Sequence, residues 1–199
     1  IVFQADCHAA GSPKVEGHPM SKIKIGDCYR FANEILIVDH FDDGIPYAIM
    51  DGNPEMVQVA DIPLPTLHLP IGNDHKKYGG AWFDMIRSGV KKEEYREFFG
   101  MDKGSPMNIK RLLTDAGDDW EWLIDAFRKF DKKTLDFVEF KPWKVLHLTN
   151  GYGHNKPQLW AHIESITIGR GKPEWGAPTD RDVFIIKLGE VFHSKNLKP

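Results

Sequence analysis

Residues 22–62 contain short β-type runs divided by tight turns, with no stretch of helical periodicity. The segment KIKIGDCYRF alternates isoleucine with lysine and then turns at Gly26-Asp27. Two further runs are divided by Asp42-Asp43-Gly44 and closed by Asp51-Gly52-Asn53, residue types that hairpin turns require. EMVQVADI adds another run. The pattern predicts a small all-β module, either a meander or an SH3-like barrel.

A different pattern follows the connector IPLPTLHLP, which three prolines make stiff. TLHLPI predicts a strand, and GGAWFDMIRSG predicts a helix that ends at Gly89. KVLHLTNG, LWAHIESITIG and DVFIIKLGEVF predict three more strands. Residues 66–199 are therefore expected to form an α+β domain with a barrel-like sheet.

Two helices are predicted between these strands. In SPMNIKRLLTDAG, Ser105 is the expected N-cap, Pro106 the first helical residue and Gly117 the terminator. DDWEWLIDAFRKF is the second helix, and its apolar face is predicted to be core packing and no stacking platform. That face is made of Trp120, Leu123, Ile124, Phe127 and Phe130.

The bulk properties narrow the class of protein. Residues 1–21 have no periodicity and predict a flexible arm, with Met20 as a candidate start of the native chain. With 41% hydrophobic and 28% charged residues, the chain has the balance of a globular protein. Its net charge of −3 excludes nucleic-acid binding through bulk positive charge, so any such contact requires a local patch.

No membrane span, signal peptide, metal site or cofactor is expected. No apolar run approaches the ~20 residues of a membrane helix, and two cysteines outside any metal spacing predict reduced thiols in a cytoplasmic protein. The nine histidines are scattered, without an HExxH pattern. DHFDD, residues 39–43, is better explained by a hairpin turn than by an acidic metal cluster. GRGKPEWG is neither a P-loop nor a GxGxxG motif.

The segment SGVKKEEYREFF, residues 88–99, carries the candidate site. Six of the eight residues after Gly89 are charged. If residues 93–98 form a strand, Glu94 and Arg96 share one face, and Lys91 in the preceding turn reaches the opening of the same candidate site. Arg96 offers a planar fork of donors, and Glu94 accepts hydrogen bonds or acts as a base. An exposed, charged edge strand with cross-strand pairs is the alternative.

AWFDMIRSGVKKEEYREF resembles the signature of the ASCH (ASC-1 homology) family within the PUA-like superfold: a helix, then G-x-K, then a strand with an arginine seven residues after the glycine. Gly89, Lys91 and Arg96 match it. Downstream, VLHLTNGYG and WAHIESITIGRGKPEWGAPTDRDVFIIKLGEVF look like the rest of a phage or prophage version. The match spans roughly residues 66–193 and leaves residues 22–62 outside.

The resemblance implies a β-barrel whose cleft, beside the helix before Gly89, is open to RNA or a modified nucleotide. Characterised members include RNA-binding proteins, a ribonuclease and an N4-acetylcytidine amidohydrolase. The hydrolases carry a threonine where this chain has Glu94, so their lysine–threonine–glutamate set is not reproduced, and only Lys91 and Arg96 carry over as pocket residues. Asn150 and Tyr152 are expected to border the pocket; Tyr152 either stacks on a base or anchors its loop.

The helices within residues 105–132 are an insertion relative to the most compact versions of this domain. Their cations extend a basic rim or form a solvated face; they are Lys110, Arg111, Arg128, Lys132 and Lys133.

Three functions follow as hypotheses. The leading one is a module that binds RNA or a nucleotide in a cleft lined by Lys91, Glu94 and Arg96. The near-neutral net charge favours recognition of a short strand or a single nucleotide, because a long contact needs more cations. The second is a hydrolase of RNA or a modified nucleoside, with Lys91 or Glu94 as base. The third is a phage adaptor that docks a host or phage protein through residues 22–62.

Overall fold

The computed structural model describes residues 24–31, 34–42, 45–50, 53–56, 62–71, 82–100, 105–114, 120–151 and 155–197. The proposed flexible arm, Gly117 and Tyr152 lie outside these ranges. Within them, no helix is long and apolar enough to cross a membrane.

The first sheet is built from the short runs near the N-terminus. Its five strands are β1 (Cys28–Phe31), β2 (Glu34–Asp42), β3 (Ile45–Met50), β4 (Asn53–Met56) and β5 (Ile62–Leu64). The hydrogen-bonded order is β4-β3-β2-β1-β5, so the first four strands form an antiparallel meander. Asp42 pairs with Ile45 and Met50 with Asn53, which places both predicted hairpins where the turn residues indicated.

The second sheet contains β6 (Thr66–Ile71), β7 (Glu93–Arg96), β8 (Val145–Asn150), β9 (Gln158–Gly169) and β10 (Val183–Lys195), in the order β6-β8-β9-β10-β7. β6 and β8 are parallel, and the other pairs are antiparallel. The domain is therefore α+β, as predicted, with a mixed sheet in which the described pairings leave β6 and β7 as edges.

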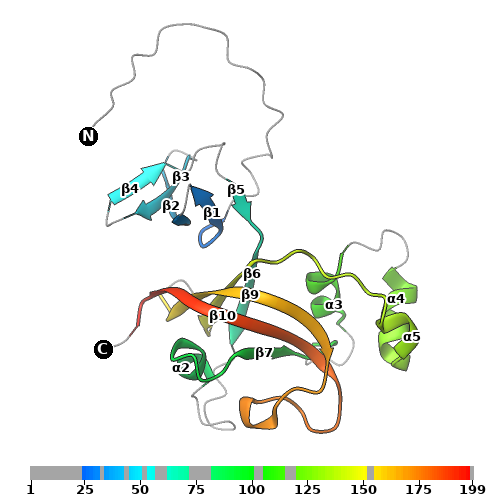
Figure 1. Cartoon of the computed structure of the whole chain (residues 1–199). Coiled ribbons are helices and arrows are strands. Elements are labelled where there is room, and N and C mark those ends of the chain that lie inside the picture. Colours follow the sequence, from blue (N-terminus) through cyan, green and yellow to red (C-terminus); the bar gives the residue numbers. More distant parts are fainter. Residues whose placement is uncertain are drawn as a thin grey trace, which may run out of the picture.

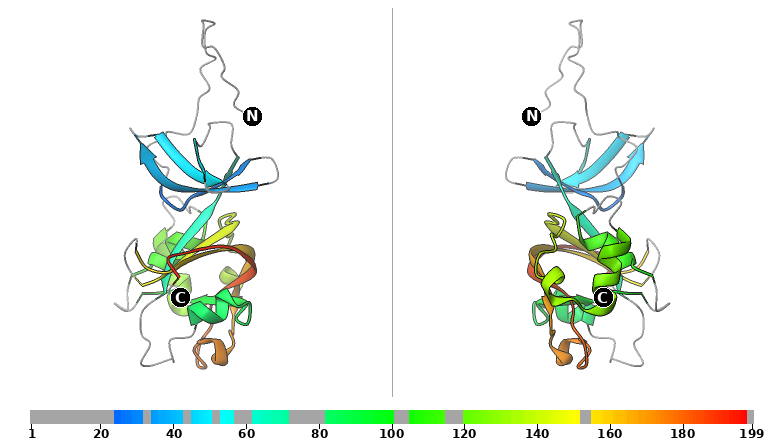
Figure 2. Two further views of the ribbon diagram at one scale, coloured as in Figure 1. Left: turned by 90° about the vertical axis from the view of Figure 1, so that its left-hand side faces the viewer. Right: turned by 90° about the vertical axis from the view of Figure 1, so that its right-hand side faces the viewer.

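Pro65 joins the two sheets. β5 pairs with β1 of the first sheet, and one residue later β6 pairs with β8 of the second. The carbonyl of Pro65 accepts hydrogen bonds from the backbone of Lys144 and Val145. The proline-rich connector is thus itself a pair of strands, which Figure 2 shows running from one sheet into the other.

The helices are α2 (Trp82–Arg87), α3 (Met107–Leu112), α4 (Trp120–Lys129) and α5 (Lys132–Leu135). α2 lies at one end of β7 and α3 to α5 lie toward the other (Figure 1). They pack on the sheet through one core, which includes Phe83 and Ile86 from α2, Ile109 and Leu112 from α3, Leu123 and Phe127 from α4, and Phe184 and Ile186 from β10. Burial of such side chains contributes about 1.5–3 kcal/mol each.

Two expectations about these helices were wrong. Pro106, and not Ser105, occupies the N-cap position of α3, and its side chain makes no capping bond. Phe130 does not belong to the buried face of α4, because 44% of it is exposed. It adopts a positive φ of 54° immediately after the helix ends, which turns its side chain away from the helical periodicity.

Candidate functional site

Gly89 reverses the chain and so positions Lys91. Its φ is +74°, a left-handed conformation that glycine adopts without strain, and its N–H donates to the Ile86 carbonyl. The backbone N–H of Lys91 then donates to the Met85 carbonyl at 2.9 Å. The G-x-K spacing therefore folds Lys91 back against the end of α2.

The Lys91 side chain is buried, with only 2% of its surface exposed. Its Nζ lies 2.8 Å from Oε2 of Glu94, and it sits 4.9 Å from the ring centre of Trp82 and 5.4 Å from that of Tyr95. A buried ammonium group without a counter-charge is strongly destabilising. The carboxylate and the two aromatic faces together compensate for the water that Lys91 has lost.

Glu94 and Arg96 share one face of β7, as the strand alternation predicted. They pair with Ile186 and Phe184 of β10, both buried, whereas Tyr95 points to the opposite face. Glu94 is only 6% exposed at its side chain, so the alternative of an exposed charged strand does not describe this face. β7 is an edge strand by its pairing, but the face that carries Glu94 and Arg96 is turned inward.

Arg96 links the two edge strands of the second sheet. Its Nη2 donates to the Pro70 carbonyl of β6 at 3.0 Å and lies 3.2 Å from Oε1 of Glu94. Its Nε is buried and has no hydrogen-bond partner among the described residues. The side chain retains 20% exposure. Arg96 is thus held in a fixed orientation with one donor unsatisfied.

The loop GRGKPEWG packs behind Lys91. A Cβ on Gly171 would lie 2.6 Å from the Tyr95 ring, and one on Gly176 would collide with the Trp82 ring. The Tyr95 hydroxyl donates to Glu93 at 2.6 Å and accepts from the backbone N–H of Lys172 at 3.0 Å. Burial and the bond to Glu93 raise the pKa of Tyr95 above its usual value. The loop therefore clamps the two rings that flank Lys91.

The remaining expected site residues are less closely placed. Asn150 ends β8 in register with Ile71, one residue beyond the Pro70 carbonyl that Arg96 binds. We find no hydrogen bond or ion pair between Asn150 and the three charged residues, and Tyr152 lies outside the described residues. Of the proposed basic rim, Lys110 faces the Trp120 ring at 5.7 Å and Arg128 the Phe99 ring at 5.9 Å.

A histidine cluster that the sequence analysis did not identify lies between the two sheets. Asp27 Oδ1 contacts His68 Nε2 at 2.9 Å, His68 Nδ1 contacts His147 Nδ1 at 2.8 Å, and His147 Nε2 contacts Gln158 Oε1 at 2.8 Å. These side chains thus form one hydrogen-bonded chain that runs from Asp27 through both histidines to Gln158. Burial and the nearby His68 lower the pKa of His147 to about 4.

Trp160 adds two further contacts to this histidine cluster. Its indole N–H donates to the Gly26 carbonyl at 3.0 Å, and its ring stacks on His147 with centres 4.1 Å apart. Strand alternation held a signal for the cluster, because TLHLPI and VLHLTN each place a histidine between two leucines. Parallel pairing sets His68 beside His147, opposite the face that carries the leucines into the core.

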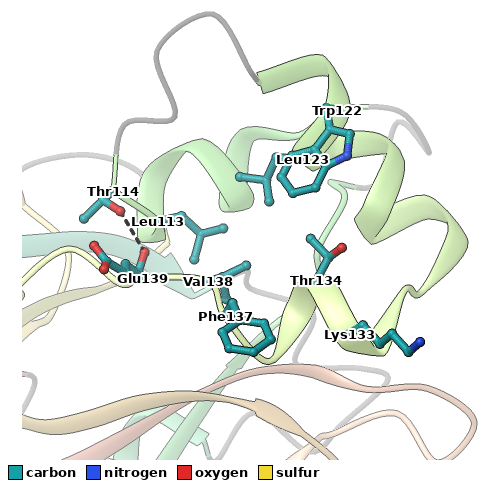
Figure 3. Close-up of a pocket in the computed structure, with 9 residues that line it drawn as sticks. All are labelled: Leu113, Thr114, Trp122, Leu123, Lys133, Thr134, Phe137, Val138 and Glu139. Atoms are coloured by element: carbon teal, nitrogen blue, oxygen red, sulfur yellow. Dashed lines mark hydrogen bonds between the residues drawn. The ribbon is translucent and has the colours of Figure 1, made fainter.

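The segment from α3 to α5 carries a separate hollow of about 440 Å³ (Figure 3). Trp122 of α4 and Phe137 after α5 line it and are 62% and 86% exposed. Leu113, Leu123 and Val138 also line it. It is mainly apolar and shares no lining residue with Lys91, Glu94 or Arg96.

Comparisons of the chain with protein-family models, with curated proteins and with solved structures found no match. Among the described residues, no group of three or more histidine, cysteine, aspartate or glutamate side chains is placed to hold a metal ion.

Proposed function

We propose that residues 66–199 form an ASCH-type domain that binds RNA or a modified nucleotide through Lys91, Glu94 and Arg96. The main support for this proposal is the arrangement of the Arg96 side chain. Its guanidinium is oriented by Glu94 and the Pro70 carbonyl, while its Nε–H lacks a described acceptor. A buried donor without a partner is costly, and a phosphate oxygen or a base acceptor is what such a donor binds.

The contact between Arg96 and Pro70 also supports a PUA-like barrel as the finer description of this domain. An arginine on β7 that reaches a β6 carbonyl requires the two edges of the sheet to approach each other. Barrel closure brings edge strands together in this way. The ligand would then enter at the end of the seam, where Arg96 is still partly exposed.

Lys91 has an indirect role in this proposal. It is too buried to contact a ligand as a free surface cation, and its ammonium group compensates one carboxylate oxygen of Glu94 while Arg96 approaches the other. Two cations on one carboxylate leave an excess positive charge at the site. That excess favours an anionic ligand such as a nucleotide phosphate.

The test is binding of cytidine 5′-monophosphate, N4-acetylcytidine and a short oligoribonucleotide to wild type and Arg96→Lys by calorimetry. Lysine keeps a charge beside Glu94 but has no fork and no Nε–H donor. We expect Arg96→Lys to weaken binding by about 1.5–3 kcal/mol, roughly 10- to 150-fold. Arg87→Lys is the matched control, since Arg87 is exposed and forms its ion pair with Asp84 of the same helix. Equal affinities for wild type and Arg96→Lys would refute the proposal.

A hydrolase is the second candidate, and the buried Lys91–Glu94 pair favours it. The pair holds a carboxylate and an ammonium group 2.8 Å apart beside Arg96, and acid–base catalysis needs a proton donor and a proton acceptor within hydrogen-bond reach of each other. RNA cleavage and N4-acetylcytidine hydrolysis should be assayed for wild type and Glu94→Gln under conditions where both are folded. Nucleotide binding by the wild type without turnover of either substrate would reject this candidate.

A further inference from the structure

Phe130 occupies a position that normally belongs to glycine. α4 ends with the Asp131 N–H donating to the Ala126 carbonyl at 3.0 Å, and Phe130 between them is left-handed with a φ of 54°. This is the helix-ending arrangement in which glycine predominates, because a side chain is strained there. A phenylalanine at this position therefore costs conformational free energy, which packing or a function of its ring must offset.

Burial of the ring does not account for it. Phe130 stacks on Phe98 with centres 6.3 Å apart and planes 22° apart, so one face of the ring is covered. Phe98 is itself buried, but Phe130 remains 44% exposed. The outer face of the Phe130 ring is consequently a flat aromatic surface open to solvent.

That face borders a hollow of about 790 Å³, a volume typical of sites for small ligands. The walls come from residues 97–100 after β7, the end of α4, and Arg181 and Asp182 before β10. Phe99 and Arg128 line it beside Phe130, with the Arg128 guanidinium 5.9 Å from the Phe99 ring centre. Two stacking rings and an arginine are thus gathered in one concave site.

Among the described residues of the hollow, one cation has no carboxylate partner. Asp182 is bound by Arg170 at 2.6 Å, and Glu97 lies 3.7 Å from Arg181, which also pairs with Asp180. Arg128 is exposed and forms no ion pair with any described residue. The carboxylates of the walls are compensated, and Arg128 is available to an anion from solvent.

We propose that this hollow is a second subsite for single-stranded RNA, in which one base stacks on Phe130 and Arg128 contacts an adjoining phosphate. Exposed aromatic faces with nearby arginines hold single strands in this way, without base selectivity. This inference rests on the proposed function of Arg96 and makes its ligand a strand, not an isolated nucleotide.

The position of the subsite fits such a strand. Glu97 follows Arg96 directly, and the Cα atoms of Arg96 and Phe99 can be at most about 11 Å apart. Phe99 lines the same hollow as Phe130, and the about 4–16 nucleotides that single-strand sites commonly span are long enough to extend from Arg96 to this hollow.

The test is fluorescence anisotropy of a fluorescein-labelled oligouridylate with wild type, Phe130→Gly and Phe130→Trp. Phe130→Gly removes the ring and relieves the left-handed strain, so we expect about 5- to 150-fold weaker RNA binding with an unchanged or higher Tm. Phe130→Trp retains the stacking face and should bind like wild type. Trp122→Ala is the matched control, because it removes an exposed aromatic ring of α4 from the other hollow.

Wild-type affinity in Phe130→Gly would overturn the inference, and a lower Tm with unchanged binding would assign Phe130 to packing or to a protein contact. Phe130→Leu still covers Phe98 but has no ring, so it gives the same test if the glycine variant unfolds. Cytidine 5′-monophosphate should bind equally to wild type and Phe130→Gly. Loss of RNA binding in Arg96→Lys but not in the Phe130 variants would remove this subsite alone, whereas no nucleotide binding by wild type would remove both proposals.

Discussion

Acidification should lower the stability of the folded protein through His147, which lies in the histidine cluster between the two sheets. In the folded protein this histidine is buried between His68, Gln158 and Trp160, and its pKa is about 4 instead of the usual 6.5. The fold therefore favours the neutral imidazole. The unfolded chain takes up a proton below about pH 6.5, which the folded chain does not accept until near pH 4.

The sign and size follow from this difference. Above about pH 6.5 both states hold a neutral His147, so its contribution to stability is fully present. As pH falls toward 4, the unfolded state gains a proton and the folded state loses up to about 3 kcal/mol of stability, of which about 2 kcal/mol is lost by pH 5. The charged or titrating groups that face His147 are His68, Asp27 and His193.

Urea unfolding of wild type and His147→Phe at about pH 7.5 and pH 5 measures this term. Phenylalanine keeps a ring against Trp160 but cannot titrate, and it loses the bonds to His68 and Gln158. We expect the variant to be less stable at the higher pH and the gap to wild type to narrow by about 2 kcal/mol at pH 5.

Two results would refute this reasoning. The first is a gap between wild type and variant that stays constant between the two pH values, since His147 would then contribute no proton uptake. The second is an NMR titration of the folded protein in which the His147 imidazole changes near pH 6.5, its unperturbed value.

Two further predictions concern the buried site. Glu94→Gln leaves Lys91 without its counter-charge and should destabilise the fold by about 3–5 kcal/mol in urea unfolding. The exposed control Glu164→Gln should cost less than about 1 kcal/mol, and an equally small effect of Glu94→Gln would show that Lys91 is solvated. Gly176→Ala places a methyl group against the Trp82 ring at a φ of +91°, so we expect a loss of at least about 1–3 kcal/mol in the free energy of unfolding and a shift in tryptophan fluorescence. Wild-type values in both measurements would contradict the close packing of Gly176 on Trp82.

Local sequence patterns anticipated much of the secondary structure. Alternating apolar residues predicted β6, β8, β9 and β10, and Asp-Gly turns predicted the first hairpins, because both signals depend on neighbours along the chain. The same alternation placed Glu94 and Arg96 on one face of β7. The predicted start of α3 was wrong by one residue, because several neighbouring residues can adopt the geometry of an N-cap.

The burial of the candidate site was beyond such patterns. Lys91 is enclosed because Gly171 and Gly176, some eighty residues later, let a loop approach Tyr95 and Trp82 closely. Arg96 is oriented by the Pro70 carbonyl, which carries no sequence signal because every residue has a carbonyl. The exposed position of Phe130 arises from a left-handed turn that the helical periodicity did not indicate.

The sequence by itself determined which residues alternate, where the chain turns and which charges are neighbours, since these are properties of short segments. Only the tertiary structure decided that Lys91 and Glu94 of SGVKKEEYREFF are buried, and that the two Leu-His-Leu segments pair in parallel and set His68 against His147. The physical reason is that burial and pairing join residues far apart in the chain, where ion pairs, carbonyl acceptors and close glycine contacts act only after the sheets have formed.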